Sequence, residues 1–153
     1  MRRLRFARLT LLAGLATGAC GTPFLEMAGE GADAVFEIEP EELVAFGQAS
    51  PFGSPSTQEV WLRSRGSGVV AVEEVFVDQD ARGTFSLAFD PTPCLLSGED
   101  EIPVELRFHP DAAGQFSGRV TFVARANGNE FEMTRRLAGT GCSDPNGDGQ
   151  CVG

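Results

Sequence analysis

The sequence predicts an all-β protein, an immunoglobulin-like antiparallel β-sandwich of seven or eight strands. Short apolar runs with a period of two recur along the chain, and Gly, Pro, Asn and Asp separate them. No segment has a convincing helical periodicity. Because successive side chains of a strand point to opposite faces, each run offers one face to a core and one to solvent. A series of short strands of this kind is typical of a sandwich.

The first five strands are expected early in the chain. Pro40 ends the first of them and Gly47 ends the second, and the Pro-, Gly- and Ser-rich stretch 47–57 follows as a loop. In the third strand, Val60 and Leu62 share one face, and Trp61 lies on the other. In the fifth, Phe85, Leu87 and Phe89 share a face. The expected ranges are 34–38, 43–46, 59–63, 69–77 and 84–89.

The later strands follow a predicted loop at 90–101. The segment 102–126 is the clearest pair of strands, joined by a Pro/Gly turn. Asn127-Gly128 is a strong hairpin signal, and the last strand is expected at 130–137. Arg135 falls on the apolar face of that strand. The expected inward residues are Val104, Leu106, Phe108, Phe116, Val120, Phe122, Phe131, Met133 and Leu137.

The N-terminal segment has the features of a targeting signal. Residues 1–8 carry four arginines, an uncharged run continues from Leu9 to Ala19, and small residues precede Cys20. This is the layout of a secretory signal peptide at 1–19. The run is shorter than the roughly 18–20 residues that a membrane-spanning helix needs. The ending Thr17-Gly18-Ala19-Cys20 resembles a bacterial lipobox, which implies lipidation of Cys20 and a flexible tether at 20–33. Ordinary cleavage near Ala19 is the alternative.

The domain at 34–141 resembles the Hydin/ASH-type immunoglobulin-like module, which is related in fold to the major sperm protein domain and is common in secreted bacterial proteins labelled choice-of-anchor D. The most specific match is V-x-L-x-F-x-P-x-x-x-G-x-x-S-G, which begins at Val104 and ends at Gly118. Further matches are LVAFG at 43–47, FSLAF at 85–89 and LAGTG at 137–141. Many relatives carry a second Cys before the strand at Ile102, where this chain has Glu101. The resemblance implies a binding or scaffolding module without catalysis.

Four cysteines are present, and lipidation of Cys20 leaves three. If the strands alternate in direction, Cys94 and Cys142 fall at opposite poles of the sandwich, too far apart for a disulfide. The sequence therefore favours a Cys142–Cys151 disulfide. Cys94 then lies outside that disulfide or forms a disulfide between two chains. Cys94–Cys142 is the alternative.

The polar C-terminal loop at 142–153 contains Asp144, Asn146, Asp148 and Gly149, which match the start of a calcium loop. The glutamate that completes such a loop would lie beyond Gly153, and no flanking helix is expected. A polar turn held by a disulfide is the alternative.

The composition argues against several classes of function. The chain has 12 Arg, no Lys, no Tyr, and one His against 22 acidic residues, a net charge of −10. Such a surface should repel nucleic acid. His109 is the only imidazole and lies in a turn, so a catalytic triad or a His-rich metal site has too few residues. Trp61 on an outer face indicates an interaction surface, or a side chain half-covered by a loop.

We therefore expect a non-enzymatic lipoprotein of the bacterial cell envelope, in the outer membrane, the periplasm or at the cell surface. Its lipid would anchor it to the membrane, and its module would bind an unknown protein or glycan partner. The alternative is a calcium-dependent adhesion or carbohydrate-binding protein that uses the C-terminal loop, with Ca²⁺ as its cofactor. In the first hypothesis no cofactor is needed.

Overall fold

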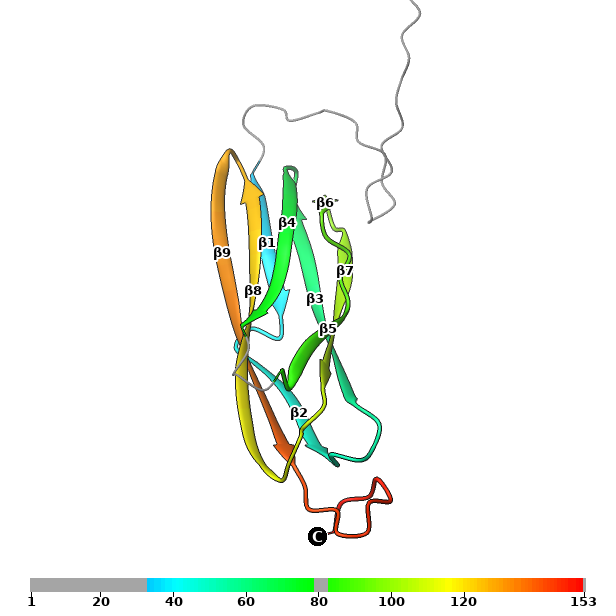
Figure 1. Cartoon of the computed structure of the whole chain (residues 1–153). Coiled ribbons are helices and arrows are strands. Elements are labelled where there is room, and N and C mark those ends of the chain that lie inside the picture. Colours follow the sequence, from blue (N-terminus) through cyan, green and yellow to red (C-terminus); the bar gives the residue numbers. More distant parts are fainter. Residues whose placement is uncertain (1–32, 79–82, 153) are drawn as a thin grey trace, which may run out of the picture.

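The computed structural model describes residues 33–78 and 83–152, and these form two β-sheets packed face to face (Figure 1). Within these ranges the structure contains nine strands, and no helix is long and apolar enough to cross a membrane. The four-stranded sheet has the order β1 (Ala34–Glu39), β3 (Ser56–Gly66), β7 (Glu101–Phe108), β5 (Phe85–Phe89). The five-stranded sheet has the order β2 (Leu43–Ala49), β9 (Asn129–Gly141), β8 (Gly114–Ala126), β4 (Val69–Asp78), β6 (Cys94–Ser97). The predicted signal peptide, Cys20 and most of the tether lie outside the described residues.

The core lies between the two sheets and is built from the alternating positions. The inward residues of the central strands are completely buried: Val60, Leu62, Val104, Leu106, Phe108, Val120 and Phe122. Phe85 stacks on Phe108 with ring centroids 5.1 Å apart. Gly139 lies under the Phe108 ring, and a Cβ at that position would come within 2.6 Å of ring atoms. Close approach of the backbone to the aromatic ring therefore requires glycine there.

The first part of the chain is shared between the sheets. β1 pairs antiparallel with β3, the chain crosses at residues 40–42, and β2 then pairs with β9. The β2–β9 pair is parallel, so the prediction of a wholly antiparallel sandwich was wrong at this pair. The reason is that the chain keeps its direction as it crosses, and the Arg136 N–H donates to the Glu42 carbonyl at 3.0 Å.

Two further local predictions were wrong. The predicted loop at 90–101 contains β6, which pairs with β4 and buries Cys94 and Leu96. Phe89 is 49% exposed and does not share the inward face of Phe85, because a β-bulge interrupts the pairing of β5 with β7 after Leu87. The hairpin signal at Asn127-Gly128 is confirmed, since both residues have positive φ, 52° and 75°.

Candidate interaction surface

The C-terminal loop is closed by the predicted disulfide. Cys142 and Cys151 are bonded, with their Cα atoms 5.4 Å apart. Cys94 lies buried at the start of β6 and takes no part in that bridge. The loop is therefore a covalently closed appendage that follows the last strand.

Asp144 fixes this loop to the loop between β2 and β3. Its buried carboxylate accepts hydrogen bonds from the Ser50 hydroxyl at 2.7 Å, the Gly149 N–H at 2.8 Å and the Asp148 N–H at 3.2 Å. These donors, the Ser50 hydroxyl first, hold the pKa of Asp144 below its ordinary value. The backbones of Gly53 and Gly149 also approach closely at this contact. The carboxylate thus acts as an internal anchor.

The residues of the predicted calcium motif are not arranged as in a cation site. Asn146 and Asp148 are exposed, and the Asp148 carboxylate accepts the Gln150 N–H at 2.9 Å. Within residues 33–78 and 83–152, no group of three or more His, Cys, Asp or Glu side chains could hold a metal ion. A calcium ligand presents its oxygens to the ion, whereas those of Asp144 face N–H and O–H donors. Calcium binding at Asp144, Asn146 and Asp148 stays a prediction.

Arg135 connects the two sheets where the chain crosses. Its Nε donates to the Pro40 carbonyl at 2.9 Å, and its two terminal nitrogens donate to Ile38 and Thr134 carbonyls at 3.2 and 3.0 Å. Burial lowers the pKa of Arg135 from its ordinary value, and the nearby charge of Glu41 partly offsets this. The inward position of this arginine is therefore explained by its hydrogen bonds to three backbone carbonyls.

Three other arginines on the outer faces, Arg63, Arg65 and Arg125, are neutralised within the molecule. Arg63 is paired with Glu39 and Glu101, and Arg65 with Glu37 and Glu99. The charge of Glu99 is the first cause that raises the pKa of Arg65. Arg125 on β8 is paired with Glu73 and Glu130. These pairs occupy the halves of both outer faces that lie nearest the Asn127-Gly128 turn.

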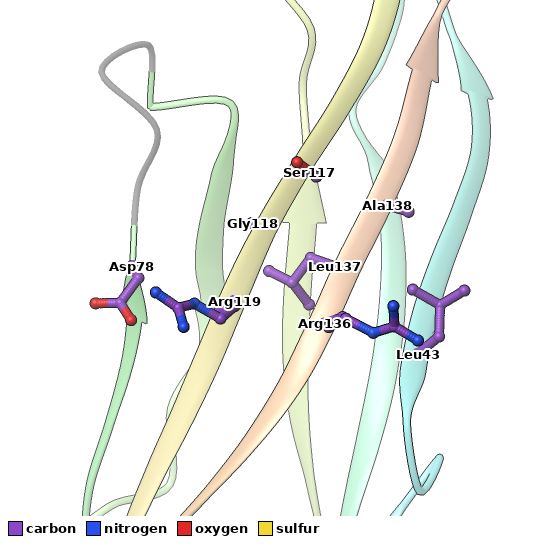
Figure 2. A pocket seen from close by; sticks show the side chains of 8 residues that line it. All are labelled: Leu43, Asp78, Ser117, Gly118, Arg119, Arg136, Leu137 and Ala138. Carbon is purple, nitrogen blue, oxygen red and sulfur yellow. The ribbon is translucent and has the colours of Figure 1, made fainter.

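The outer face of the five-stranded sheet contains a shallow pocket of about 470 Å³ (Figure 2). Arg119 of β8 and Arg136 of β9 stand directly opposite each other there. Figure 2 shows the Arg119 guanidinium directed toward Asp78 and that of Arg136 toward Leu43. Ser117 and Ala138, the next outward pair, line the same pocket.

The two pocket arginines differ from the paired ones. Both side chains are exposed, and among the described residues neither guanidinium makes an ion pair within 4.0 Å. Like charges directly opposite on neighbouring strands destabilise a sheet. Leu43 beside them is 42% exposed, so an apolar surface adjoins the two charges. This is an arrangement suited to binding a carboxylate next to an apolar group.

Sequence reasoning missed these two arginines. They are 17 positions apart in the chain, and only the β8–β9 register brings them together. The Asn127-Gly128 turn, which was predicted correctly, already sets that register, since the hairpin pairs residues outward from it. The pair could therefore have been found from the sequence. Trp61 does lie on an outer face, as predicted, and is half-buried there. His109 is exposed in the turn after β7, with no structural neighbour that suggests catalysis among the described side chains.

Solved structures share this fold at low sequence identity. An ASH/PapD-like domain of human CEP192 (PapD-like domain 7) is 14% identical with a TM-score of 0.53, over 94% of this chain and 99% of that domain. The CsuC–CsuE chaperone–tip adhesion subunit pre-assembly complex of Acinetobacter baumannii is 12% identical with a TM-score of 0.52, over 70% of this chain and 57% of that one. Vibrio cholerae VesB protease is 12% identical with a TM-score of 0.57, over 69% of this chain.

This chain spans only 31% of the VesB chain, and the likeness is one of fold alone. No protein-family model and no curated protein matches the sequence. The chain has the immunoglobulin-like fold of ASH and PapD-like domains, which confirms the predicted resemblance at the level of the fold.

Proposed function

We propose that this protein is a non-enzymatic lipoprotein of the bacterial cell envelope whose immunoglobulin-like module binds a protein partner. The basic start, the apolar run and Cys20 in residues 1–20 support export and lipidation. The fold shared with a chain of a chaperone–tip adhesion subunit complex supports a role in protein binding. A single acylated cysteine would hold the domain on the membrane through the segment before β1.

One observation carries the choice of docking surface. Arg119 and Arg136 are register partners on the outer face of β8 and β9, and neither makes an ion pair in the described structure, in a chain with 22 acidic residues. A guanidinium binds a carboxylate through two parallel hydrogen bonds, so this pair favours an acidic segment of the partner. Binding would relieve the repulsion between the arginines, and Leu43 adds apolar contact beside them. The surface named here, Leu43, Ser117, Arg119, Arg136 and Ala138, is the arginine face.

The arginine face is tested by photo-cross-linking in cells. A photoreactive amino acid replaces Ala138 in the full chain, and adducts are separated by mass and identified. We expect a discrete adduct that disappears in the Arg119→Ser/Arg136→Ser variant. The same reagent at Val69, the exposed first residue of β4, is the control and should not give that adduct. An adduct that survives loss of both arginines would refute the docking surface.

Lipidation is tested separately. Cells that express the full chain are fed a labelled fatty acid, and the protein is compared with Cys20→Ala. The unmodified sequence should take up label and partition into detergent, and Cys20→Ala should do neither. Label on the alanine variant would refute an anchor at Cys20.

A further inference from the structure

We propose that the arginine face is occupied by the outer face of the four-stranded sheet of a second copy of this chain. This inference rests on the proposed docking surface and names its partner. The interaction would stack copies sheet on sheet, with acidic groups of one against basic groups of the next.

The outer face of the four-stranded sheet carries the complementary charge pair. Glu59 of β3 and Glu105 of β7 are directly opposite each other, with inward Val60 and Val104 as the next pair. They line a shallow pocket of about 520 Å³ together with Thr57, Gln58 and Trp61. Neither glutamate makes an ion pair within the part of the chain that the structure describes. We call Thr57, Glu59, Trp61 and Glu105 the glutamate face.

The two like-charge pairs are matched in strand position. Each joins two neighbouring strands that are not at a sheet edge, β8 with β9 on one side and β3 with β7 on the other. Each also lies beside the crossing at residues 40–42. Glu39, at the end of β1, pairs with Trp61, and Leu43, at the start of β2, pairs with Arg136. The pairs therefore stand back to back through the sandwich, so a copy placed on one face repeats the same surface outward.

The flanking residues favour the same contact. In the halves of both outer faces nearest the Asn127-Gly128 turn, Arg63, Arg65 and Arg125 are held in internal ion pairs. Among the described residues, Arg119 and Arg136 are therefore the outward arginines of the five-stranded sheet that remain available to a partner. Asp78 lies opposite Arg119, and Arg107 lies one outward position beyond Glu105, so the flanking charges are also of opposite sign. Leu43 beside the arginines and Trp61 beside the glutamates offer apolar contact within a polar rim.

The contact between two different faces determines which kind of assembly forms. The contact joins different surfaces of the two partners, so it is heterologous, and each added copy leaves one arginine face and one glutamate face free. Association would therefore give a concentration-dependent series of species and no closed twofold dimer. The net charge of −10 opposes close approach of copies, so the interaction is expected to be weak in solution and favoured where copies share a membrane.

The test uses two variants that each lose one face. The full chain carries Cys20→Ala throughout, so that no acyl chain gathers copies, and sedimentation velocity reports the species. Wild-type surfaces should give a series that grows with concentration. Arg119→Ser/Arg136→Ser and Glu59→Gln/Glu105→Gln should each associate at least about tenfold more weakly alone. An equimolar mixture should form one-to-one dimers that grow no further, because each variant keeps the face that the other lost.

Controls separate the outcomes. Thermal melting must show that both variants are folded, and Glu73→Gln/Arg125→Ser, which removes charges that are already paired, should leave association unchanged. A monomeric wild-type chain, or a mixture that stays monomeric, would overturn the self-association. If photo-cross-linking at Ala138 then captures a different protein through Arg119 and Arg136, the docking surface stands and only its occupant was wrong. If neither experiment shows contact, both proposals fall.

Discussion

Removal of the Arg135 side chain is expected to destabilise the domain more than removal of its neighbour. In Arg135→Ala, the carbonyls of Ile38 and Pro40 lose donors at 3.2 and 2.9 Å, both in partly buried positions. A hydrogen bond from a charged group contributes about 1.5–3 kcal/mol, and water can replace part of this at a half-buried site. The net loss should be about 2 kcal/mol, or a melting temperature lower by about 8 °C.

Arg136→Ala is the matched control, because it removes the same side chain one position later. The Arg136 side chain is exposed and makes no ion pair with a described residue, so the free energy of unfolding should change by less than about 0.5 kcal/mol. Denaturant titration measures both variants. Arg135→Lys should recover less than half of the loss, since a single ammonium cannot reproduce the fork that reaches three carbonyls. Equal stability losses for the two alanine variants would refute the structural role of Arg135.

The remaining predictions concern the loop and the core. The pKa of Asp144 is lowered in the folded state, so its ionised carboxylate stabilises the fold at neutral pH, and this stabilisation is lost as pH falls through about 4 and below. Asp144→Asn should therefore reduce the loss of folding stability at acid pH, measured by denaturant titration against pH. An unchanged loss would contradict this. Cys142→Ser/Cys151→Ser opens a loop whose cysteines are nine positions apart, and should lower the free energy of unfolding by about 2–3 kcal/mol in denaturant titration. Amide hydrogen exchange in the loop should become faster. Unchanged exchange would show that the hydrogen bonds alone hold the loop. Gly139→Ala should cost about 1–3 kcal/mol because its Cβ meets the Phe108 ring, and Phe108→Leu should partly rescue it in a double-mutant cycle, whereas additive losses would rule out that contact.

Alternation of side chains was enough to predict which residues form the core. Val104, Leu106 and Phe108 on β7, and Val120 and Phe122 on β8, are all completely buried as expected. These strands lie in the centres of their sheets, where one face is always covered. A period of two therefore determines their orientation without knowledge of the neighbouring strand.

Features that depend on a distant strand were beyond this reasoning. β6 has only four residues in a stretch with two prolines and a glycine, and pairing with Val70 and Val72 of β4 makes it a strand. The parallel direction of β2 comes from the crossing at 40–42 and not from any residue within β2. The candidate site was predicted only as an unspecified surface. The opposition of Glu59 and Glu105 depends in the same way on a distant strand. That of Arg119 and Arg136 follows from the predicted Asn127-Gly128 turn and was overlooked.

The parallel pairing of β2 with β9 also determines how the domain would carry tension. The chain enters β1 at one end of the sandwich, and the C-terminal loop lies at the other end (Figure 1). A pull between these ends moves β2 and β9 in opposite directions along their own axes, so the hydrogen bonds between them are loaded together and do not open one at a time. A domain tethered to a membrane before β1 and held at its far end would meet force in this direction. Single-molecule extension should then record a higher rupture force between these ends than across the β8–β9 hairpin, where the strands can be peeled apart.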